Sequence, residues 1–429
     1  MAEQDLFDLR ADTVRCPHAV FTELQGEPIH RVEAIDAWVV TRYEDIAWVN
    51  RHPDLFSNRL ATGPVLARQL AATVADLAET DEDVRRTLQE RAGRGTTKVL
   101  LNADPPLHSR QRALVNRAFT PMRVRTREPL IRSVAEDLVA AFADRGEVEL
   151  VTAFAVPLPL TLIAVLLGVP VEDMAAFKRW SDDFVVAIGN HHLTAEQSRR
   201  MILSQAEFFG YFAERIAERR VAPTDDLLSE LVTARLDGEE LTEQEMLSMC
   251  NQFLVAGNET TTKLIASAML WLTRRPELAD SLRGDPDAIR LFVEEVLRLE
   301  APVQGLFRVA NQATTVGGVD IPEGAALWLV YGAGNRDASV YAEPGECRPE
   351  RTLRDPHLAF GLGEHFCLGA ALARAEARIG LEVLLDAMDG VRLAVPEEEL
   401  DYEPSYALRG LHRLPLVFTP RRSPVGAPA

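Results

Sequence analysis

One cysteine near the C-terminal end of the chain stands among residues that favour metal ligation. Residues 360–369 read F-G-L-G-E-H-F-C-L-G, and Cys367 is the only cysteine of this segment. Its three glycines permit tight turns in which main-chain N–H groups can point at the sulfur. A helix is predicted to follow, from residue 368 to about residue 388, and its N-terminus adds partial positive charge. These surroundings predict a lowered pKa for the Cys367 thiol and a thiolate that can bind a metal.

A lone cysteine is more often a small buried hydrophobic residue than a ligand. The setting of Cys367 shifts that balance, because Phe360 and Phe366 would keep water away and no second cysteine lies close in the sequence. One strong anionic donor on a rigid loop suits the axial position of a large prebuilt cofactor such as haem. A cysteine nucleophile paired with His365 is a competing interpretation, but two residues on one turn are poorly placed for base-assisted attack.

The composition is that of an ordinary soluble globular protein. Of the 429 residues, 47% are hydrophobic and 26% are charged, and the net charge of −19 argues against nucleic acid as a partner. The sequence has no signal peptide and no apolar run near the roughly 20 residues of a membrane span, so we expect no membrane insertion. The four cysteines are scattered, without the spacing of a metal knuckle, which favours a reducing, cytoplasmic location.

A long helix is predicted in the second half of the chain. Residues 242–245 read T-E-Q-E, a capping box, and nothing stops a helix before Pro276. Such a helix has roughly 33 residues and a length of about 50 Å, so it must run through the middle of the protein. Its centre, residues 256–262, reads A-G-N-E-T-T-T, although glycine and threonine are poor helix-interior residues. Local conflicts of this kind tend to mark functional sites, and a kink satisfied by water is the alternative.

Two pairs and one run of charged residues have helical spacing. His108 and Arg112 lie four apart after Asp104, which is expected to cap their helix, and they could hold an anionic group or form a surface pair. Glu295 and Arg298 lie three apart and predict an ion pair. A basic run without any acidic residue also spans residues 105–127. Its arginines are Arg110, Arg112, Arg117, Arg123, Arg125 and Arg127. This run is either a solvated helix face or a docking site for an acidic partner.

Taken together, these segments resemble the cytochrome P450 family. Residues 360–369 match the family's cysteine-ligand loop F-G-x-G-x-H-x-C-x-G at every defining position, and residues 256–260 match its oxygen-binding groove A-G-x-[D/E]-T. His108 and Arg112 match its H-x-x-x-R. The resemblance runs over about residues 17–418, nearly the whole chain.

The resemblance implies a mainly α fold with small β-sheets (α+β), in which the long central helix lies over a haem. It also implies a single domain over residues 1–429, because residues far apart in the sequence would share one site. Glu295 and Arg298 match the family's E-x-x-R, which would lock the segment before the cysteine loop with Arg351 as a third partner. Cys347 departs from the pattern, since the family usually has phenylalanine there, and this puts the local packing in doubt.

The resemblance also implies roles for individual residues. Cys367 would ligate the iron of heme b (iron protoporphyrin IX). The residues that would grip its propionates are His108, Arg112, Arg308 and His365. Thr260 would form hydrogen bonds at the oxygen-binding position, and Glu259 would relay protons from solvent.

The implied activity is that of a soluble, bacterial-type haem-thiolate monooxygenase. Such an enzyme inserts one oxygen atom from O2 into a lipophilic small molecule, by hydroxylation or epoxidation. Electrons would come from a ferredoxin and its ferredoxin reductase, so NAD(P)H would act only indirectly. The basic run, with Arg374 and Arg378 beside the cysteine loop, would dock the ferredoxin.

Three alternatives keep the haem: a haem-thiolate peroxygenase, a non-oxygenating haem enzyme such as an isomerase, and a haem-based gas sensor. Neither of the first two needs a proton relay, so the presence of Glu259 and Thr260 favours the monooxygenase. By family resemblance the substrate would touch residues 180–200, 254–258 and 303–306. A fourth contact would come from residues 406–408. These segments are mostly apolar and imply a lipophilic substrate.

Overall fold

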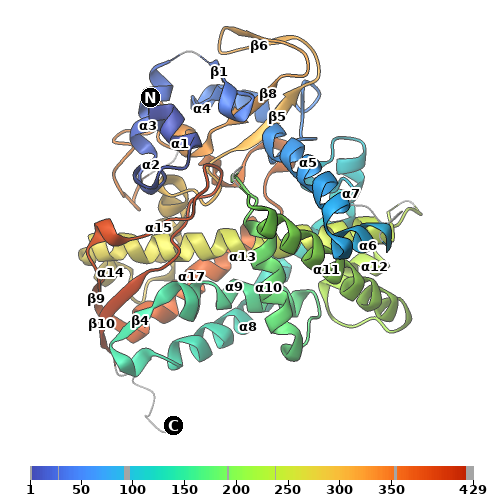
Figure 1. Cartoon of the computed structure of the whole chain (residues 1–429). Coiled ribbons are helices and arrows are strands. Elements are labelled where there is room, and N and C mark those ends of the chain that lie inside the picture. The colour runs from blue at the N-terminus through green and yellow to red at the C-terminus, as the bar shows by residue number, and fades with distance from the viewer. Residues whose placement is uncertain are drawn as a thin grey trace.

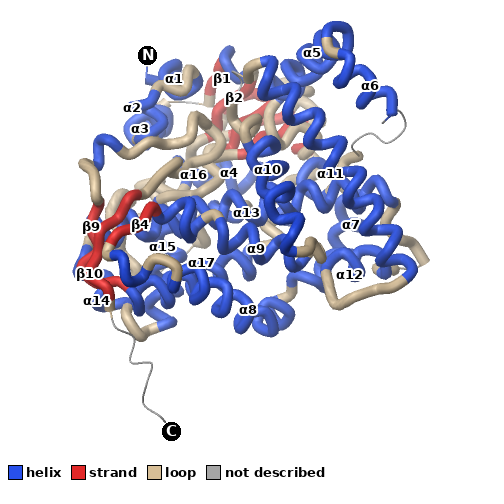
Figure 2. The backbone as a smooth tube through the Cα atoms, turned by 60° about the horizontal axis from the view of Figure 1, so that its bottom comes forward, coloured by secondary structure: helices blue, strands red, loops and turns tan. Residues whose placement is uncertain are grey.

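A computed structural model describes residues 2–27, 29–90, 97–190, 193–236, 238–351 and 355–421 of the chain. The chain is mainly helical and its strands form small sheets, as predicted (Figures 1 and 2). The α-helices are α1 (Ala2–Phe7), α2 (Ala11–Arg15), α3 (His18–Gly26), α4 (Tyr43–Asn50), α5 (Pro64–Thr80), α6 (Glu82–Glu90), α7 (Leu107–Val115), α8 (Pro121–Ala140), α9 (Pro157–Leu166), α10 (Met174–Val185), α11 (Ala195–Val221), α12 (Leu227–Thr233), α13 (Glu243–Arg274), α14 (Pro276–Leu282), α15 (Pro286–Leu299), α16 (Tyr331–Gly334) and α17 (Ala370–Ala387).

In the described part of the chain the strands form three sheets, two of which join distant parts of the sequence. They are β1 (His30–Val32), β2 (Ala37–Val40), β3 (Phe56–Ser57), β4 (Glu147–Glu149), β5 (Leu306–Ala310), β6 (Thr314–Val316), β7 (Val319–Ile321), β8 (Ala326–Leu329), β9 (Met388–Leu393) and β10 (Pro415–Pro420). The largest sheet has the order β1-β2-β8-β5-β3, the second has the order β4-β10-β9, and β6 and β7 form a hairpin. In the largest sheet Trp38 of β2 lies opposite Leu327 of β8, so the N-terminal strands are built onto strands from the second half of the chain.

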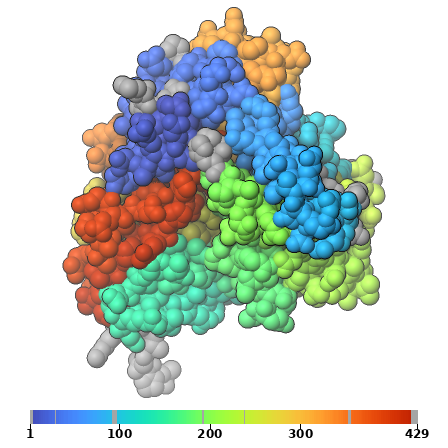
Figure 3. All heavy atoms as spheres, viewed as in Figure 1, coloured from blue at the N-terminus to red at the C-terminus, as the bar shows by residue number. Residues whose placement is uncertain are grey.

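The N-terminal helices also lie against the C-terminal segment. Figure 3 shows the dark-blue and red parts of the chain side by side on one face. Arg15 of α2 donates a hydrogen bond to the Glu398 carbonyl at 2.6 Å, and Arg409 donates one to the Val14 carbonyl at 2.9 Å. The C-terminal loop is thereby held to the start of the chain.

The predicted long helix is confirmed as α13, which has 32 residues. Both arms of its capping box form, because the Thr242 hydroxyl accepts from the Glu245 N–H and the Glu245 carboxylate accepts from the Thr242 N–H. Figure 1 shows α13 crossing the middle of the molecule, with α9, α10 and α17 close to it. Residues 256–262 are helical throughout, so the glycine and threonines do not interrupt α13.

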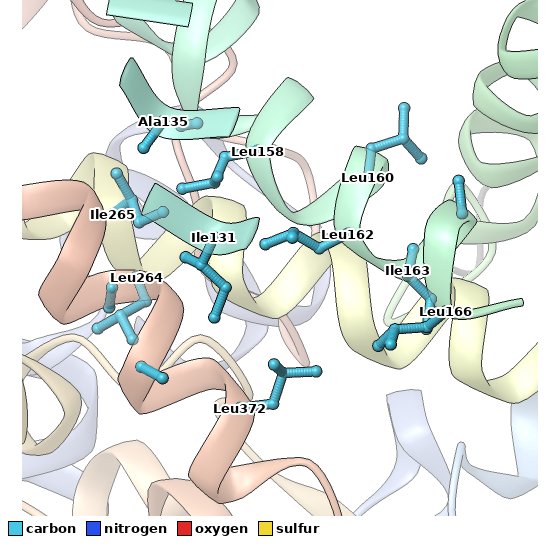
Figure 4. Close-up of a cluster of buried hydrophobic side chains, with 14 of the residues drawn as sticks. Ile131, Ala135, Leu158, Leu160, Leu162, Ile163, Leu166, Leu264, Ile265 and Leu372 are labelled. Carbon is cyan, nitrogen blue, oxygen red and sulfur yellow. The ribbon is translucent and has the colours of Figure 1, made fainter. Parts of the chain in front are cut away.

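The largest apolar core lies where α8, α9, α13 and α17 meet (Figure 4). Helix α9 has the sequence P-L-P-L-T-L-I-A-V-L, which is apolar on all sides and is therefore suited to the interior. The side chains that converge from the four helices in Figure 4 include Ile131, Leu158, Leu162, Leu264, Ile265 and Leu372. This packing holds α13, which carries Glu259 and Thr260, in a fixed relation to α17, which directly follows the cysteine loop.

The predicted ion pair of Glu295 and Arg298 is confirmed and is deeply buried. Arg298 donates to the two Glu295 carboxylate oxygens at 2.9 and 2.8 Å. Arg351 completes the cluster as predicted, with its Nε 3.3 Å from Glu295 Oε1. Arg298 also donates to the carbonyl oxygens of residues 335, 344 and 346, which ties the segment before the cysteine loop to α15. Cys347 is buried in the apolar core, so the cysteine is accommodated there.

Among the helices that the structure describes, none combines the length and the apolar composition needed to cross a membrane.

Candidate active site

The cysteine loop is a closed turn between α4 and α17. The Cys367 N–H donates to the Phe360 carbonyl at 2.9 Å, and this bond closes the loop. Gly363 has a φ of +73°, and a Cβ atom there would collide with the carbonyl oxygen of Asn50 in α4. Only glycine fits this position without strain, so the loop is held against α4 by the absence of a side chain.

The pKa of the Cys367 thiol is shifted in the direction opposite to the prediction. Burial raises the pKa of the Cys367 thiol, so the predicted lowering is wrong. The main-chain N–H groups of Gly369 and Ala370 do act on the thiolate, together with the charges of Arg112 and Arg374, but they offset burial only in part. Because a bound metal cation deprotonates a coordinating thiol outright, these groups would stabilise a ligating thiolate rather than create a free one.

Four of the predicted site residues come together beside this loop. The His108 and His365 rings lie with their centroids 4.0 Å apart and their planes at 33°. Arg112, one turn along α7 from His108, donates to the Phe366 carbonyl at 2.8 Å. Arg308, on β5, donates to Asn50 Oδ1 at 2.8 Å. The chain therefore brings α7, β5 and the cysteine loop to one place.

The polar atoms of this cluster have unused hydrogen-bonding capacity. His108 Nδ1 and His365 Nε2 are both buried without a hydrogen-bond partner among the described residues. Burial, followed by the charges of His108, Arg308 and Arg112, lowers the pKa of His365 to about 2. Buried nitrogens without a hydrogen bond are costly, and two guanidinium groups favour anions, although the Glu364 carboxylate lies 3.5 Å from His365 Nε2. This donor set fits the two carboxylate groups of a haem.

A metal ion is a second candidate ligand for part of this cluster. The ligand atoms of His108, Glu364 and His365 all lie within 4.8 Å of one another. However, the positive charges of Arg112 and Arg308 lower the pKa of His365, and they would repel a divalent cation in the same way. The surroundings therefore favour an anionic ligand over a metal at these three residues.

The centre of α13 presents hydroxyl and carboxyl groups with defined partners. The Thr260 hydroxyl donates to the Ala256 carbonyl at 2.8 Å, and the Thr261 hydroxyl donates to the Gly257 carbonyl at 3.2 Å. Both hydroxyls thus bond to carbonyls of their own helix, which is one reason why threonine is a poor helix-interior residue. Because the Thr260 proton is committed to Ala256, the free capacity of the Thr260 oxygen is that of an acceptor. Glu259 forms an ion pair with Lys263, one turn further along α13.

The segments predicted to touch the substrate also adjoin one another. Ser405 Oγ donates to the Ile188 carbonyl at 2.8 Å, and the Tyr406 N–H donates to the Gly189 carbonyl at 3.2 Å. Val303 and Leu408 form an isolated β-bridge. Residues 191 and 192, within the predicted 180–200 region, lie outside the described residues.

Helix α13 meets the same region. Asn258 Nδ2 donates to Ser181 Oγ of α10 at 2.9 Å. Asn258, which occupies the variable position of the A-G-x-[D/E]-T pattern, therefore links α13 to α10.

The predicted cap at Asp104 is wrong. The Asp104 carboxylate accepts from Ser57 Oγ at 2.5 Å and from the Asn58 N–H at 2.7 Å, and α7 has no side-chain cap. Asp104 instead holds the residues of β3 and its following turn, which lie nearly fifty residues earlier. Sequence spacing could not show this partner, because the contact is tertiary.

Three ionisable residues near the centre of α13, two buried and one partly exposed, were not predicted. They are Lys263, Glu376 and Glu403. Burial raises the pKa of Glu376, on α17, to about 8, and its hydrogen bond to Thr261 opposes this shift. The sequence signal was available for Lys263, since a lone lysine followed by L-I-A-S-A-M-L is out of place on a buried helix.

Several arginines of the predicted basic patch are already ion-paired, so the patch offers fewer available positive charges than the sequence suggests. Arg110 is paired with Glu245, and Arg112 belongs to the site described above. Arg374 is paired with Glu294 at 2.6 Å, and Arg378 with Glu128 and Glu382. Arg117, Arg123 and Arg125 are exposed, and Arg123 Nη2 lies 3.6 Å from Glu230.

Comparison with known proteins gives the same assignment over most of the chain. The sequence model of the family Cytochrome P450 matches residues 70–389. Cytochrome P450 107B1 of Saccharopolyspora erythraea is 36% identical over 403 residues, which cover 93% of this chain and 94% of that protein. The mycinamicin IV hydroxylase/epoxidase of Micromonospora griseorubida is 38% identical over 405 residues, covering 93% and 94%. The structure of cytochrome P450 CYP109Q5 from Chondromyces apiculatus superposes with a TM-score of 0.81 at 35% identity, covering 96% and 98%. The chain therefore belongs to the cytochrome P450 family, and it is a haem-iron monooxygenase that acts on lipophilic small molecules.

Proposed function

We propose that Cys367 ligates the iron of heme b, and that four residues hold the two propionates. These residues are His108, Arg112, Arg308 and His365. The proposal is supported by the unpartnered buried nitrogens of the two histidines and by the two guanidinium groups beside them. When bound, the haem supplies the electron transfer and the activation of O2. Phe360 stacks under Arg374 at 4.5 Å. Phe366 is 38% exposed, so the expectation that it keeps water from the loop is wrong.

The observation that carries the catalytic proposal is the orientation of Thr260. Its proton is donated to the Ala256 carbonyl, so its oxygen accepts a hydrogen bond from a protonated group at the oxygen-binding position. Glu259, the preceding residue, delivers protons to that position as an acid–base group. Thr260 and Glu259 are therefore the proposed catalytic residues. Insertion of oxygen into a substrate C–H or C=C bond needs these protons, whereas a peroxygenase or a non-oxygenating haem enzyme does not.

Thr260→Ala tests this proposal. We expect the variant to bind haem normally but to divert electrons from product to hydrogen peroxide. The ratio of product to peroxide should fall about tenfold or more, since a hydrogen bond to a charged or protonated group contributes about 1.5–3 kcal/mol. The measurement is product and peroxide formed per NADPH consumed in the reconstituted enzyme.

A matched control is Thr262→Ala. The Thr262 hydroxyl donates to the Ala155 carbonyl at 2.9 Å, outside the site, so its loss should change stability but not the product ratio. Unchanged coupling in Thr260→Ala would contradict the proton-delivery role. Full turnover with peroxide alone, and none with NADPH and redox partners, would favour the peroxygenase.

We also propose a ferredoxin with its ferredoxin reductase as the electron donors, so that NAD(P)H acts only through them. Arg117 and Arg125 supply exposed positive charge just after α7, whose Arg112 contacts the cysteine loop, in a protein with a net charge of −19. The ion-paired Arg374 and Arg378 contribute less to this surface than their sequence position suggests. The chain is proposed to act as one domain in the cytoplasm, where its four free cysteines stay reduced.

Arg117→Glu tests the docking surface. We expect slower reduction by an acidic ferredoxin and a weaker dependence of the reduction rate on salt, because one attractive charge becomes repulsive. Stopped-flow reduction at several ionic strengths measures both. Arg85→Glu is the control, since Arg85 is an exposed arginine paired with Glu82 on α6. Equal reduction rates for the wild type and Arg117→Glu would exclude Arg117 from the docking surface.

A further inference from the structure

Lys263 lies in a setting that isolated lysines avoid. Its side chain is 1% exposed, and its ammonium group contacts two carboxylates, Glu259 on the same helix and Glu403 Oε2 at 2.6 Å. Glu259 and Glu403 are 15% and 22% exposed, so Glu403 is the more open of the two. The side chains of Glu403, Lys263 and Glu259 thus lie in contact one after another. They lead from the partly exposed Glu403 to Glu259, which directly precedes Thr260.

The C-terminal loop is shaped to make this contact. A Cβ atom at Gly410 would collide with the Lys263 stem, so a glycine there lets the lysine pass the loop. The Glu403 N–H donates to the Gly410 carbonyl at 3.0 Å, and Tyr402 and Leu411 form a β-bridge. Glu403 is therefore held across a narrow hairpin from the point where Lys263 passes.

The charges of this cluster do not balance when all three groups are ionised. One ammonium faces two carboxylates, which leaves one negative charge in a buried place and favours the uptake of one proton. Burial raises the pKa of Glu403 to about 7, against the opposing effect of Lys263. Burial would also raise the pKa of Glu259, but Lys263 outweighs it and the pKa lies below its ordinary value. Glu403 is therefore the group that holds the proton near neutral pH.

The neighbouring charged groups are engaged elsewhere. Lys178 of α10 contributes to the lowered pKa of Glu259, and it is paired with Asp182 at 2.7 Å. Arg409, on the same loop as Glu403, is paired with Glu300 at 2.8 Å. Lys263 is thus the cation in direct contact with both the Glu259 and the Glu403 carboxylates.

We propose that Lys263 and Glu403 are positioning residues of the proton relay, in which Glu403 holds a proton next to Lys263 and Lys263 passes one to Glu259. Lys263 gives one proton to the Glu259 carboxylate and takes one from the Glu403 carboxyl group, so its own charge does not change. Solvent then returns a proton to Glu403. This inference rests on the proposed role of Glu259, and it extends the relay by two residues that lie outside the A-G-x-[D/E]-T pattern.

Glu403→Gln tests the inference in the reconstituted holoenzyme. In the wild type we expect coupled product formation to decline as the pH rises through about 7, because Glu403 loses its proton there. In Glu403→Gln the decline should disappear, and product per electron should be lower by about tenfold to a hundredfold across the range.

Glu300→Gln is the matched control, because it removes a buried acid paired with the same loop but leaves Lys263 untouched. It should lower stability and keep the decline near pH 7. A Glu403→Gln enzyme that keeps the wild-type product yield and the decline would overturn the inference, as would a Glu300→Gln enzyme that loses the decline.

A second measurement does not depend on turnover. Infrared spectra of the substrate-free protein should contain a carboxylic-acid component that titrates near pH 7 and is missing in Glu403→Gln. A second component, from Glu376, whose pKa burial raises to about 8, should remain in that variant. In Lys263→Met the band should grow, since both carboxylates lose their cation and bind protons. An unchanged band in both variants would overturn the inference.

Glu259→Gln separates this inference from the proposed function. If Glu259→Gln leaves coupling intact, the role of Glu259 itself is wrong. If Glu259→Gln uncouples the enzyme and Glu403→Gln does not, only the extension to Lys263 and Glu403 is wrong.

Discussion

Cys367→Ser is expected to abolish the thiolate signature in the optical spectrum of the haem-loaded protein. Serine has nearly the same size, so the loop should still close through the hydrogen bond from residue 367 to the Phe360 carbonyl. A serine hydroxyl is a far weaker anionic donor than a thiolate, and the electron density that favours O–O cleavage is lost. We expect turnover to fall by on the order of a hundredfold or more, equivalent to about 3 kcal/mol of transition-state stabilisation.

The control for this prediction is Cys347→Ser. Cys347 is also a buried cysteine, it lies in the segment tied to Arg298, and it has no proposed role in the site. Its replacement should leave the spectrum unaltered. A thiolate spectrum that survives in Cys367→Ser, or that disappears in Cys347→Ser, would show that the ligand has been assigned to the wrong cysteine.

Glu295→Gln is expected to produce the largest loss of stability. The substitution leaves the Arg298 guanidinium, which is 0% exposed, without its charged partner. Breaking a buried ion pair of this kind by removal of one member costs about 3–5 kcal/mol. We expect the free energy of unfolding to fall by about this amount in denaturant titrations, with a smaller fraction of the protein retaining haem.

Glu343→Gln provides the comparison. Glu343 pairs with Arg348 at 2.5 Å in the same segment, but both side chains are largely exposed and solvent already screens the pair. The unfolding midpoint should hardly move. Equal effects of the two substitutions would argue that the Glu295 cluster does not lock the segment before the cysteine loop.

Short-range patterns predicted much of the fold and of the site. The capping box at residues 242–245 and the absence of any breaker before Pro276 were enough to predict α13, because helix ends depend on neighbouring residues. The segment 360–369 likewise singled out Cys367 as the proposed ligand, since its glycines and the cysteine lie within ten residues of one another. The ion pair of Glu295 and Arg298 was predictable for the same reason, being one helical turn apart.

Other predictions failed where a long-range contact competes with a local one. Asp104 was expected to cap α7, but its carboxylate is used by Ser57 and Asn58. Arg374 looked available for docking beside the cysteine loop, but Glu294 of α15 pairs with it. The thiol pKa was predicted from nearby N–H groups, and burial outweighs them. In each case the competing partner or the burial comes from residues that sequence spacing does not bring close.

The sequence by itself predicted Cys367 as the iron ligand and determined the helix that carries Glu259 and Thr260 and the family to which the chain belongs. These features rest on residues within one or two turns of each other, where geometry follows from chain connectivity. Only the tertiary structure decided which charges meet. Glu403 reaches Lys263 across 140 residues of sequence, and His108 reaches His365 across more than 250. Such pairs form because tertiary packing brings α7 to the cysteine loop and the C-terminal loop to α13, and removes the water that would otherwise screen the charges.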